Sequence, residues 1–342
     1  METTPRRLSP TTVSLIIIAT IMVIGLLKAA QVVLLPLVVS AFLAILLSPV
    51  IVLLMRRNWP ILPAALASLF LVFAIVFLGV FIFTKSLQSL GTELPLYWER
   101  MMGAVRNLDA LMRERGFDLE LAHFFRSFDL MNLTPVVTKS VGFVVSFMKY
   151  GIMIFFITLF MLLEASRLQE KTMRAFGEKN IFSSSMRGIA TDIQRYLIVK
   201  TAISLATGIS VGLFLWFLEV PFPMLWGVIT FLLNYIPSVG SIVASIPPIL
   251  LGLMHPEAPI LEALKIGLGL LTIQSILGSY LDPRLMGKNL NLSALIVFMS
   301  MVGWGWIWGP AGMLIAVPLT VCMKVVLSYH PRTRPFALML EG

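Results

Sequence analysis

Long runs without any Asp, Glu, Lys or Arg constrain the fold of this chain more than any other feature. They cover residues 8–27, 29–55, 58–84, 201–218, 220–256, 266–281 and 289–323. About 20 apolar residues in a helix cross the hydrocarbon core of a bilayer. Only 13% of the residues are charged, against about 25% in soluble domains. The sequence therefore predicts an all-α integral membrane protein.

The polar segments between these runs divide the chain. We expect spans 1–3 within residues 1–84, at about Val13–Leu27, Val33–Met55 and Ile61–Thr84. We then expect an extracytoplasmic helical insertion at 85–139, span 4 at 140–163, a cytoplasmic helical segment at 164–200, a transport region at 201–327 and a cytoplasmic tail at 328–342. Within the transport region, span 5 covers 201–218 and a further span covers 266–281.

The basic residues predict how the chain is oriented, because cytoplasmic loops of membrane proteins collect Lys and Arg. Arg6 and Arg7 place the N-terminus in the cytoplasm, and Arg56 and Arg57 place the end of span 2 there. The same rule explains the net charge of +9 without a nucleic-acid partner. Both termini are then cytoplasmic, and the insertion faces outward.

The run at 220–256 is too long for one straight span, and Pro and Gly break it near its middle. It either crosses once or enters and returns as a re-entrant hairpin. The charge rule favours the hairpin, since Arg284 and Lys288 then become cytoplasmic. The run at 291–327 has a similar break, so the two resemble the halves of an inverted repeat. Such paired broken segments indicate the binding site of a transporter.

Polar and helix-breaking residues in these segments are the predicted substrate site. They are Asn234, Pro237, Ser238, Gly240, Ser241, Ser245, Gln274, Ser275, Gly309, Pro310 and Gly312. The alternatives are a proline kink satisfied by Ser hydroxyls, hydrogen bonds between helices, and a packing seam beside Trp anchors. A structural or gating role is expected for Asp282, Pro283, Arg284 and Gly287, with pairing of Asp282 and Arg284, or else a solvated loop. Lys149 is expected to reach the membrane surface.

Several function classes are excluded by missing motifs. The sequence has no Walker A loop, no HExxH and no Gly-x-Ser-x-Gly elbow, so neither an enzyme nor a metal site or cofactor is predicted. Cys322 is the single cysteine, which rules out a disulfide within the chain. The carboxylates Glu164, Glu219 and Asp282 lie at span edges, which disfavours an ion-coupled antiporter.

Three blocks resemble the autoinducer-2 exporter family of bacterial membrane proteins. They are PFPMLWGVITFLLNYIPSVGSIVASIPPIL at 221–250, SYLDPRLMGKNLNLSALIVFMSMV at 279–302 and GWIWGPAGMLIAVPLTVCMKVVL at 305–327. The resemblance implies a multi-pass transporter of the bacterial inner membrane. It would export a small signalling molecule of quorum sensing, autoinducer-2, or another small solute. The resemblance also implies a homo-oligomer, with a pentamer expected.

We therefore expect a carrier that exports a small polar solute by alternating access, with two broken hairpins meeting near the bilayer midplane. Two alternatives stay open. One is a cation/proton antiporter or channel, and the other is a membrane scaffold or assembly protein that works through its outward insertion.

Overall fold

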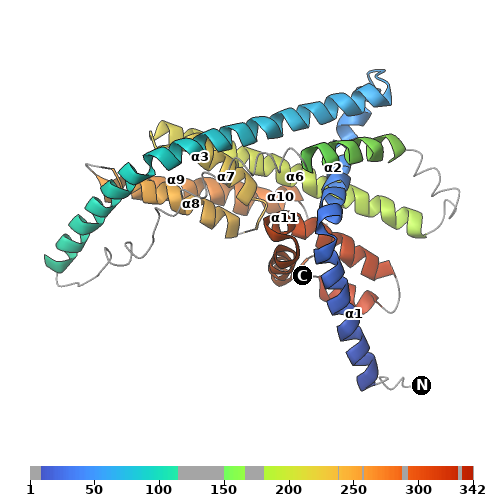
Figure 1. The fold of residues 1–342 in the computed structure, drawn as a ribbon. Helices are drawn as coiled ribbons and strands as arrows, with labels where there is room; N and C mark the ends of the chain where they lie inside the picture. The colour runs from blue at the N-terminus through green and yellow to red at the C-terminus, as the bar shows by residue number, and fades with distance from the viewer. Residues whose placement is uncertain are drawn as a thin grey trace.

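The computed structural model describes residues 9–114, 150–165, 181–237, 239–255, 258–286, 292–329 and 333–341. Every regular element in these ranges is a helix, which confirms the predicted fold class (Figure 1). Within these ranges, six helical stretches are long and apolar enough to cross a membrane: Pro10–Ala29, Gln31–Met55, Ile61–Glu93, Thr191–Phe217, Pro259–Leu285 and Ala294–Ser328. The chain is a multi-pass membrane protein.

The first two helices follow each other with a single residue between them. Helix α1 spans Pro10–Ala29 and begins where the Ser9 hydroxyl accepts a hydrogen bond from the Thr12 N–H at 3.2 Å. Helix α2 spans Gln31–Met55. Both contain the spans predicted for them. Figure 1 shows α1 projecting from the rest of the chain, and its main contacts are with α2 and α11.

Helix α3 is the longest element and continues past the predicted edge of the membrane. It spans Ile61–Glu114, and its 54 residues measure about 81 Å at 1.5 Å per residue. Nothing interrupts it at residue 85, where we expected the insertion to begin. The charged residues after that point are compatible with a helix in water, so the span and the insertion share one helix. Residues 115–139 and Lys149 lie outside the described ranges; the helix Tyr150–Ala165 belongs to span 4.

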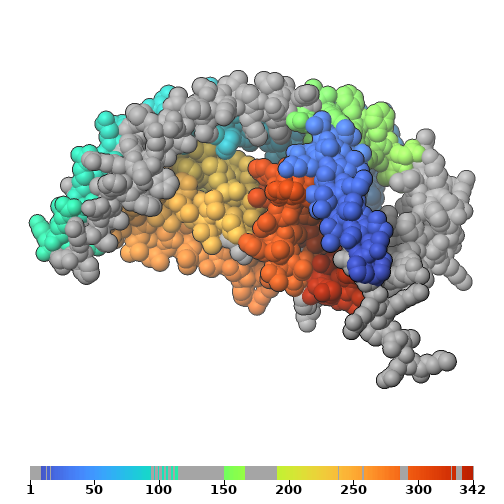
Figure 2. Space-filling model, turned by 60° about the horizontal axis from the view of Figure 1, so that its bottom comes forward, coloured from blue at the N-terminus to red at the C-terminus, as the bar shows by residue number. Residues whose placement is uncertain are grey.

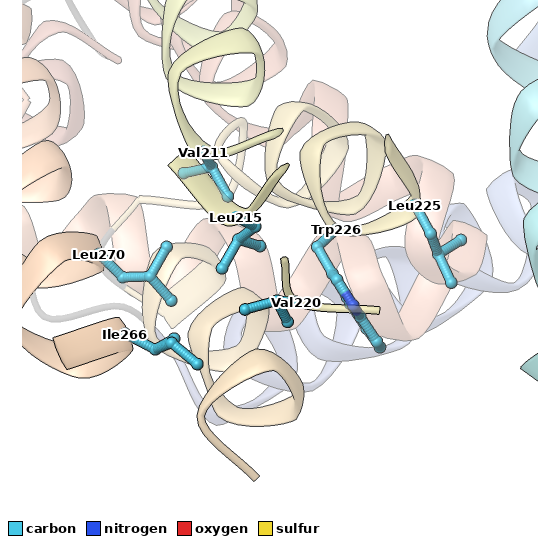
Figure 3. Close-up of a cluster of buried hydrophobic side chains, with 7 residues drawn as sticks. All are labelled: Val211, Leu215, Val220, Leu225, Trp226, Ile266 and Leu270. Carbon is cyan, nitrogen blue, oxygen red and sulfur yellow. The ribbon is translucent and has the colours of Figure 1, made fainter. Parts of the chain in front are cut away.

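The largest core joins four helices around the transport region and also contacts Phe83, Leu87 and Leu90 of α3. Helices α6 (Ile181–Phe217), α7 (Pro223–Leu233), α8 (Val239–Gly252) and α9 (Pro259–Gln274) contribute to it. Figure 3 shows Ile266 and Leu270 of α9 facing Leu215 of α6 and Val220, with Trp226 of α7 beside them. A second core joins α2, α3 and the helix Tyr150–Ala165.

Helices α6 and α7 approach so closely that their backbones touch. A Cβ added at Gly208 would lie 2.7 Å from the carbonyl oxygen of Gly227, and one added at Gly227 would lie 2.8 Å from that of Gly208. Gly212, four residues after Gly208, also faces Gly227. This is the small-residue packing by which membrane helices associate when no hydrophobic force drives them together.

Helices α7 and α8 form a hairpin whose turn falls at the predicted break, residues 234–237. Trp226, near the start of α7, shares a core with Ile249 and Leu251, near the end of α8. Only glycine fits at position 240, because a Cβ there would lie 1.8 Å from the Leu233 carbonyl oxygen. The 11 residues of α7 measure about 16 Å, roughly half of a 30 Å hydrocarbon layer. That the hairpin is re-entrant stays a prediction.

The further span begins earlier than predicted and ends in an irregular helix. Helix α9 starts at Pro259 instead of 266, and its first turns contain Glu262 and Lys265, which pair with each other at 2.7 Å. It passes directly into the π-helix η2 (Ser275–Leu281) and the short helix α10 (Asp282–Met286). The sequence analysis did not predict the π-helix.

Helix α11 (Ala294–Tyr329) folds back on itself at Gly309, which has φ 66° and ψ −153°. A Cβ added at Gly312 would lie 2.1 Å from the Trp304 carbonyl oxygen, and Leu292 packs near Val321. The second predicted break is therefore also a helical hairpin. Its turn lies at the end of α1, where the Trp308 Nε1–H donates to the Leu27 carbonyl at 3.0 Å.

The turns of the two hairpins have different neighbours, and the expected meeting of the two hairpins near the bilayer midplane stays a prediction. Among the described contacts, the first turn is held by α6 and the second by α1. The C-terminal tail packs against the open end of the second hairpin. There α12 (Arg334–Met339) is followed by Leu340, whose carbonyl accepts from the Ser293 N–H at 3.1 Å.

Candidate functional site

A cavity of about 930 Å³ lies between the first hairpin, the α9–η2–α10 segment and the second hairpin, with α6 behind it. Figure 2 shows the yellow and orange surface of α7–α9 beside the orange-red surface of α11, and the cavity is lined from both. The volume is near the upper end of the roughly 300–1,000 Å³ range of sites for drug-sized ligands.

Six of the predicted substrate-site residues line this one cavity. They are Asn234, Pro237, Ser241, Ser245, Gln274 and Ser275. Asp282 and Pro283, predicted to have structural or gating roles, line it as well. Segments separated by about forty residues in the sequence are brought together because α8 packs along α9. The structure places these residues in one site, and their role in binding stays a prediction.

The other predicted residues lie elsewhere. Gly240 is buried inside the first hairpin, where it permits the close approach of α7 and α8. Gly309, Pro310 and Gly312 form the turn of the second hairpin at the end of α1 and do not line the cavity. These two glycines and the proline allow α11 to fold back on itself. Ser238 and Gly287 lie outside the described residues.

Asp282 pairs with Lys200 of α6, and the expected pairing with Arg284 is wrong. The Lys200 Nζ lies 2.8 Å from Asp282 Oδ2, and the two side chains are 5% and 14% exposed. Residues two apart on a helix do not face each other, so Arg284 points away from Asp282. The guanidinium of Arg284 lies over the Tyr280 ring instead, 3.9 Å from its centre.

Three polar atoms at the cavity are buried without a hydrogen-bond partner among the described residues. They are Oε1 and Nε2 of Gln274 and Oδ1 of Asp282. An unsatisfied buried polar group costs about 1–3 kcal/mol, so folded proteins keep few of them. The two residues lie on the same segment and line the same cavity. The atoms themselves have almost no accessible surface, so a ligand contacts them only after the side chains that cover them move.

The turn of the first hairpin is tied to α6 by two hydrogen bonds. Asn234 Nδ2–H donates to Ser204 Oγ at 3.1 Å, and the Tyr235 hydroxyl donates to Thr201 Oγ1 at 2.8 Å. The Ser245 hydroxyl donates to the Ser241 carbonyl within α8, at 2.8 Å. The first two bonds join side chains and the third lies within α8, so the alternative of a kink satisfied by Ser hydroxyls stays a prediction. Asn234 fixes the cavity wall and also lines it.

The π-helix forms the polar wall opposite this turn. Ser275, Gly278 and Ser279 of η2 line the cavity between Gln274 and Asp282. π-Helices are rare, and single turns of them are found frequently at functional sites.

Sequence reasoning missed two groups of lining residues. Tyr196 and Lys200 come from the segment assigned to the cytoplasm, although Thr191–Phe217 is one continuous apolar helix. The second group is apolar, and its members come from α8, α9 and α11: Ile242, Ile246, Ile249, Leu271, Val297, Phe298, Met301 and Val317. The isoleucines of α8 alternate with polar residues, and this pattern could have predicted that they line the site. Among the described residues, no three His, Cys, Asp or Glu side chains gather to hold a metal ion.

The comparisons with known proteins agree with this architecture. The model of the AI-2E family transporter matches residues 15–332. The AI-2 transport protein TqsA of Escherichia coli (strain K12) is 32% identical over 325 residues, covering 94% of this chain and 92% of TqsA. YhhT of the same strain, named for transport, is 26% identical over 321 residues, covering 94% of this chain and 91% of its own length. These relatives are transport proteins and not enzymes, and the chain belongs to the AI-2E transporter family.

Proposed function

We propose that this protein exports a small polar solute across the bacterial inner membrane by alternating access, with the cavity as its binding site. The observation that supports this most is the pair of unsatisfied residues, Gln274 and Asp282, on the wall of a cavity between two broken hairpins. Broken membrane segments that meet at a polar site are the usual construction of secondary transporters.

The free polar atoms favour a hydroxylated solute. Gln274 offers one amide donor group and one acceptor oxygen, and Asp282 Oδ1 offers a further acceptor. A hydroxyl group both donates and accepts, so a polyol satisfies these atoms at once. TqsA is named for AI-2 transport. A signal of that kind, with a role in quorum sensing, fits the hydroxyl chemistry.

The two cores are linked through α3. One core joins α6, α7, α8 and α9 and also contacts Phe83, Leu87 and Leu90 of α3, while the other joins α2, α3 and the helix Tyr150–Ala165. The touching backbones of Gly208 and Gly227 hold α6 and α7 together. We expect alternating access to move the helices around the cavity against α3.

For the topology and the assembly we keep the expectations from the sequence. With Arg56 and Arg57 in the cytoplasm, both termini are cytoplasmic and the distal part of α3 faces outward. The apolar surface of α1 is almost wholly exposed in the single chain. A homo-oligomer, a pentamer by family resemblance, covers part of such a surface.

A cation/proton antiporter is the second candidate, and one observation favours it. Asp282 is a carboxylate on the cavity wall, paired with a buried Lys200, while its Oδ1 remains unpartnered. Carboxylates inside membrane proteins often belong to ion pathways. Asp282 therefore weakens the argument that we drew from carboxylates at span edges.

The test is solute flux in proteoliposomes that contain the full chain. A panel of polyols and furanoses is loaded inside, and efflux is followed with and without pH and sodium gradients. Saturable efflux of a hydroxylated solute is expected. Ion flux alone, without efflux of any solute above protein-free liposomes, would support the antiporter and overturn the exporter.

A further inference from the structure

The cavity is polar at one end and apolar at the other. Asp282, Lys200 and the π-helix surround the polar end. The apolar end lies toward Gly267 of α9, where an added Cβ would meet Ile249 of α8 at 3.7 Å. Seven residues of helix separate Gly267 from Gln274, which is roughly 10 Å along α9. The cavity is therefore elongated, with a gradient of polarity along it.

Apolar side chains that line the cavity have large exposed fractions. Leu271 is 65% exposed, Ile242 64% and Phe298 50%. They come from three elements that surround the cavity, α9, α8 and α11. Their exposed surface includes the cavity wall, so they present an apolar surface to a ligand.

A small polar solute uses only part of this space. It satisfies Gln274 and Asp282, but it leaves the apolar wall of Ile246, Ile249 and Leu271 without a partner. A cavity of about 930 Å³ suits a drug-sized molecule. We infer that the cavity takes an amphiphile, whose hydroxylated head binds at Gln274 and Asp282 and whose apolar tail lies along α8, α9 and α11. This inference rests on the proposed function, because it takes the same cavity as the transport site, and it extends the ligand from a small polar solute to an amphiphile.

An anionic head is disfavoured at this site. Lys200 is already neutralised by Asp282 Oδ2, and the unpartnered carboxylate oxygen Oδ1 is buried in the cavity wall, so it contacts a ligand only when the side chains that cover it move. That oxygen requires a donor, such as a hydroxyl group. A carboxylate or phosphate head would place like charges together. The chemistry selects a neutral, hydroxylated head.

Alkyl glucosides below their micelle concentrations are suitable probes. Binding of methyl and octyl β-glucoside to the full chain in nanodiscs is measured against empty nanodiscs. Octyl β-glucoside is expected to bind at least tenfold more tightly, because each buried methylene adds to the transfer free energy. Gln274→Met, which removes the free amide, should weaken both ligands.

Two variants on α9 distinguish the contribution of the tail to binding from that of the head. Gly267→Leu fills the apolar end and should remove the advantage of the octyl chain, while methyl β-glucoside binds as before. Gly267→Ala, with a Cβ in ordinary contact, is the milder variant if the leucine prevents folding. Leu268→Phe, at a position 58% exposed and outside the cavity lining, is the matched control.

The outcomes distinguish this inference from the proposed function. Equal affinities for the two glucosides, or an octyl advantage that survives the Gly267 variants, would overturn the amphiphile and leave a carrier of small solutes. Binding of neither glucoside, together with no solute efflux from proteoliposomes, would overturn both.

Discussion

Replacing Lys200 by Met tests how strongly the ion pair at the cavity supports the fold. The Lys200 and Asp282 side chains are 5% and 14% exposed, and their charged atoms lie 2.8 Å apart. Met keeps the length of the chain and removes the charge. Asp282 then has neither carboxylate oxygen paired, since Oδ1 already lacks a partner. Breaking a buried pair by removing one partner costs about 3–5 kcal/mol.

Unfolding of the purified protein in mixed micelles with increasing dodecyl sulfate, followed by Trp fluorescence, measures this loss. Lys265→Met is the matched control, because it breaks the Lys265–Glu262 pair, whose lysine is 49% exposed. An exposed pair contributes about 0–1 kcal/mol. The control should therefore unfold close to the parent protein, while Lys200→Met unfolds at a much lower denaturant fraction.

The double variant Lys200→Met/Asp282→Asn completes the cycle. Removal of both charges leaves no uncompensated ion, and exchange of a whole buried pair for neutral groups is often close to neutral. We expect the double variant to recover most of the stability lost in Lys200→Met. If Lys200→Met is within about 1 kcal/mol of the parent, or if the double variant is less stable than the single one, the reasoning on a buried, coupled pair is refuted.

Two further predictions concern glycines. Gly208→Leu should separate α6 from α7, because even a Cβ would lie 2.7 Å from the Gly227 carbonyl oxygen. The yield of monodisperse protein measures this loss of packing. A normal yield would contradict the close contact of the two helices. Gly309→Ala places a side chain at φ 66° and should cost about 1–3 kcal/mol in the same unfolding assay. Gly303→Ala, with nothing within 4 Å of the added Cβ, should not destabilise; equal effects at the two positions would refute a strained turn.

The spans and both hairpin breaks could be predicted from the sequence because they depend on local properties. The length of a charge-free run indicates whether it can cross the hydrocarbon core, and Pro and Gly interrupt helices. The break at 234–237 and the fold-back at Gly309 are both present where these residues gather. The cluster from Asn234 to Ser245 was likewise visible as polar residues inside an apolar run.

The composition of the site depends on contacts between distant segments and was less predictable. Lys200 reaches Asp282 across 82 residues of sequence, and this pairing follows only from how α6 packs beside α10. The π-helix leaves no known signature in the string SILGSYL. Gly309 and Gly312 seemed equivalent to Pro237 and Gly240, yet their turn contacts α1 because α11 has longer arms.

The most direct test of the proposed binding site is Gln274→Met, assayed for stability and for solute efflux on the same preparation. Met removes two buried polar atoms that lack partners, so the variant should be as stable as the parent or more stable by about 1 kcal/mol. Efflux of the best hydroxylated solute should fall about tenfold at limiting concentration, as expected for about 1.4 kcal/mol of lost binding. Unchanged efflux from a fully folded Gln274→Met protein would contradict the assignment of this cavity as the transport site.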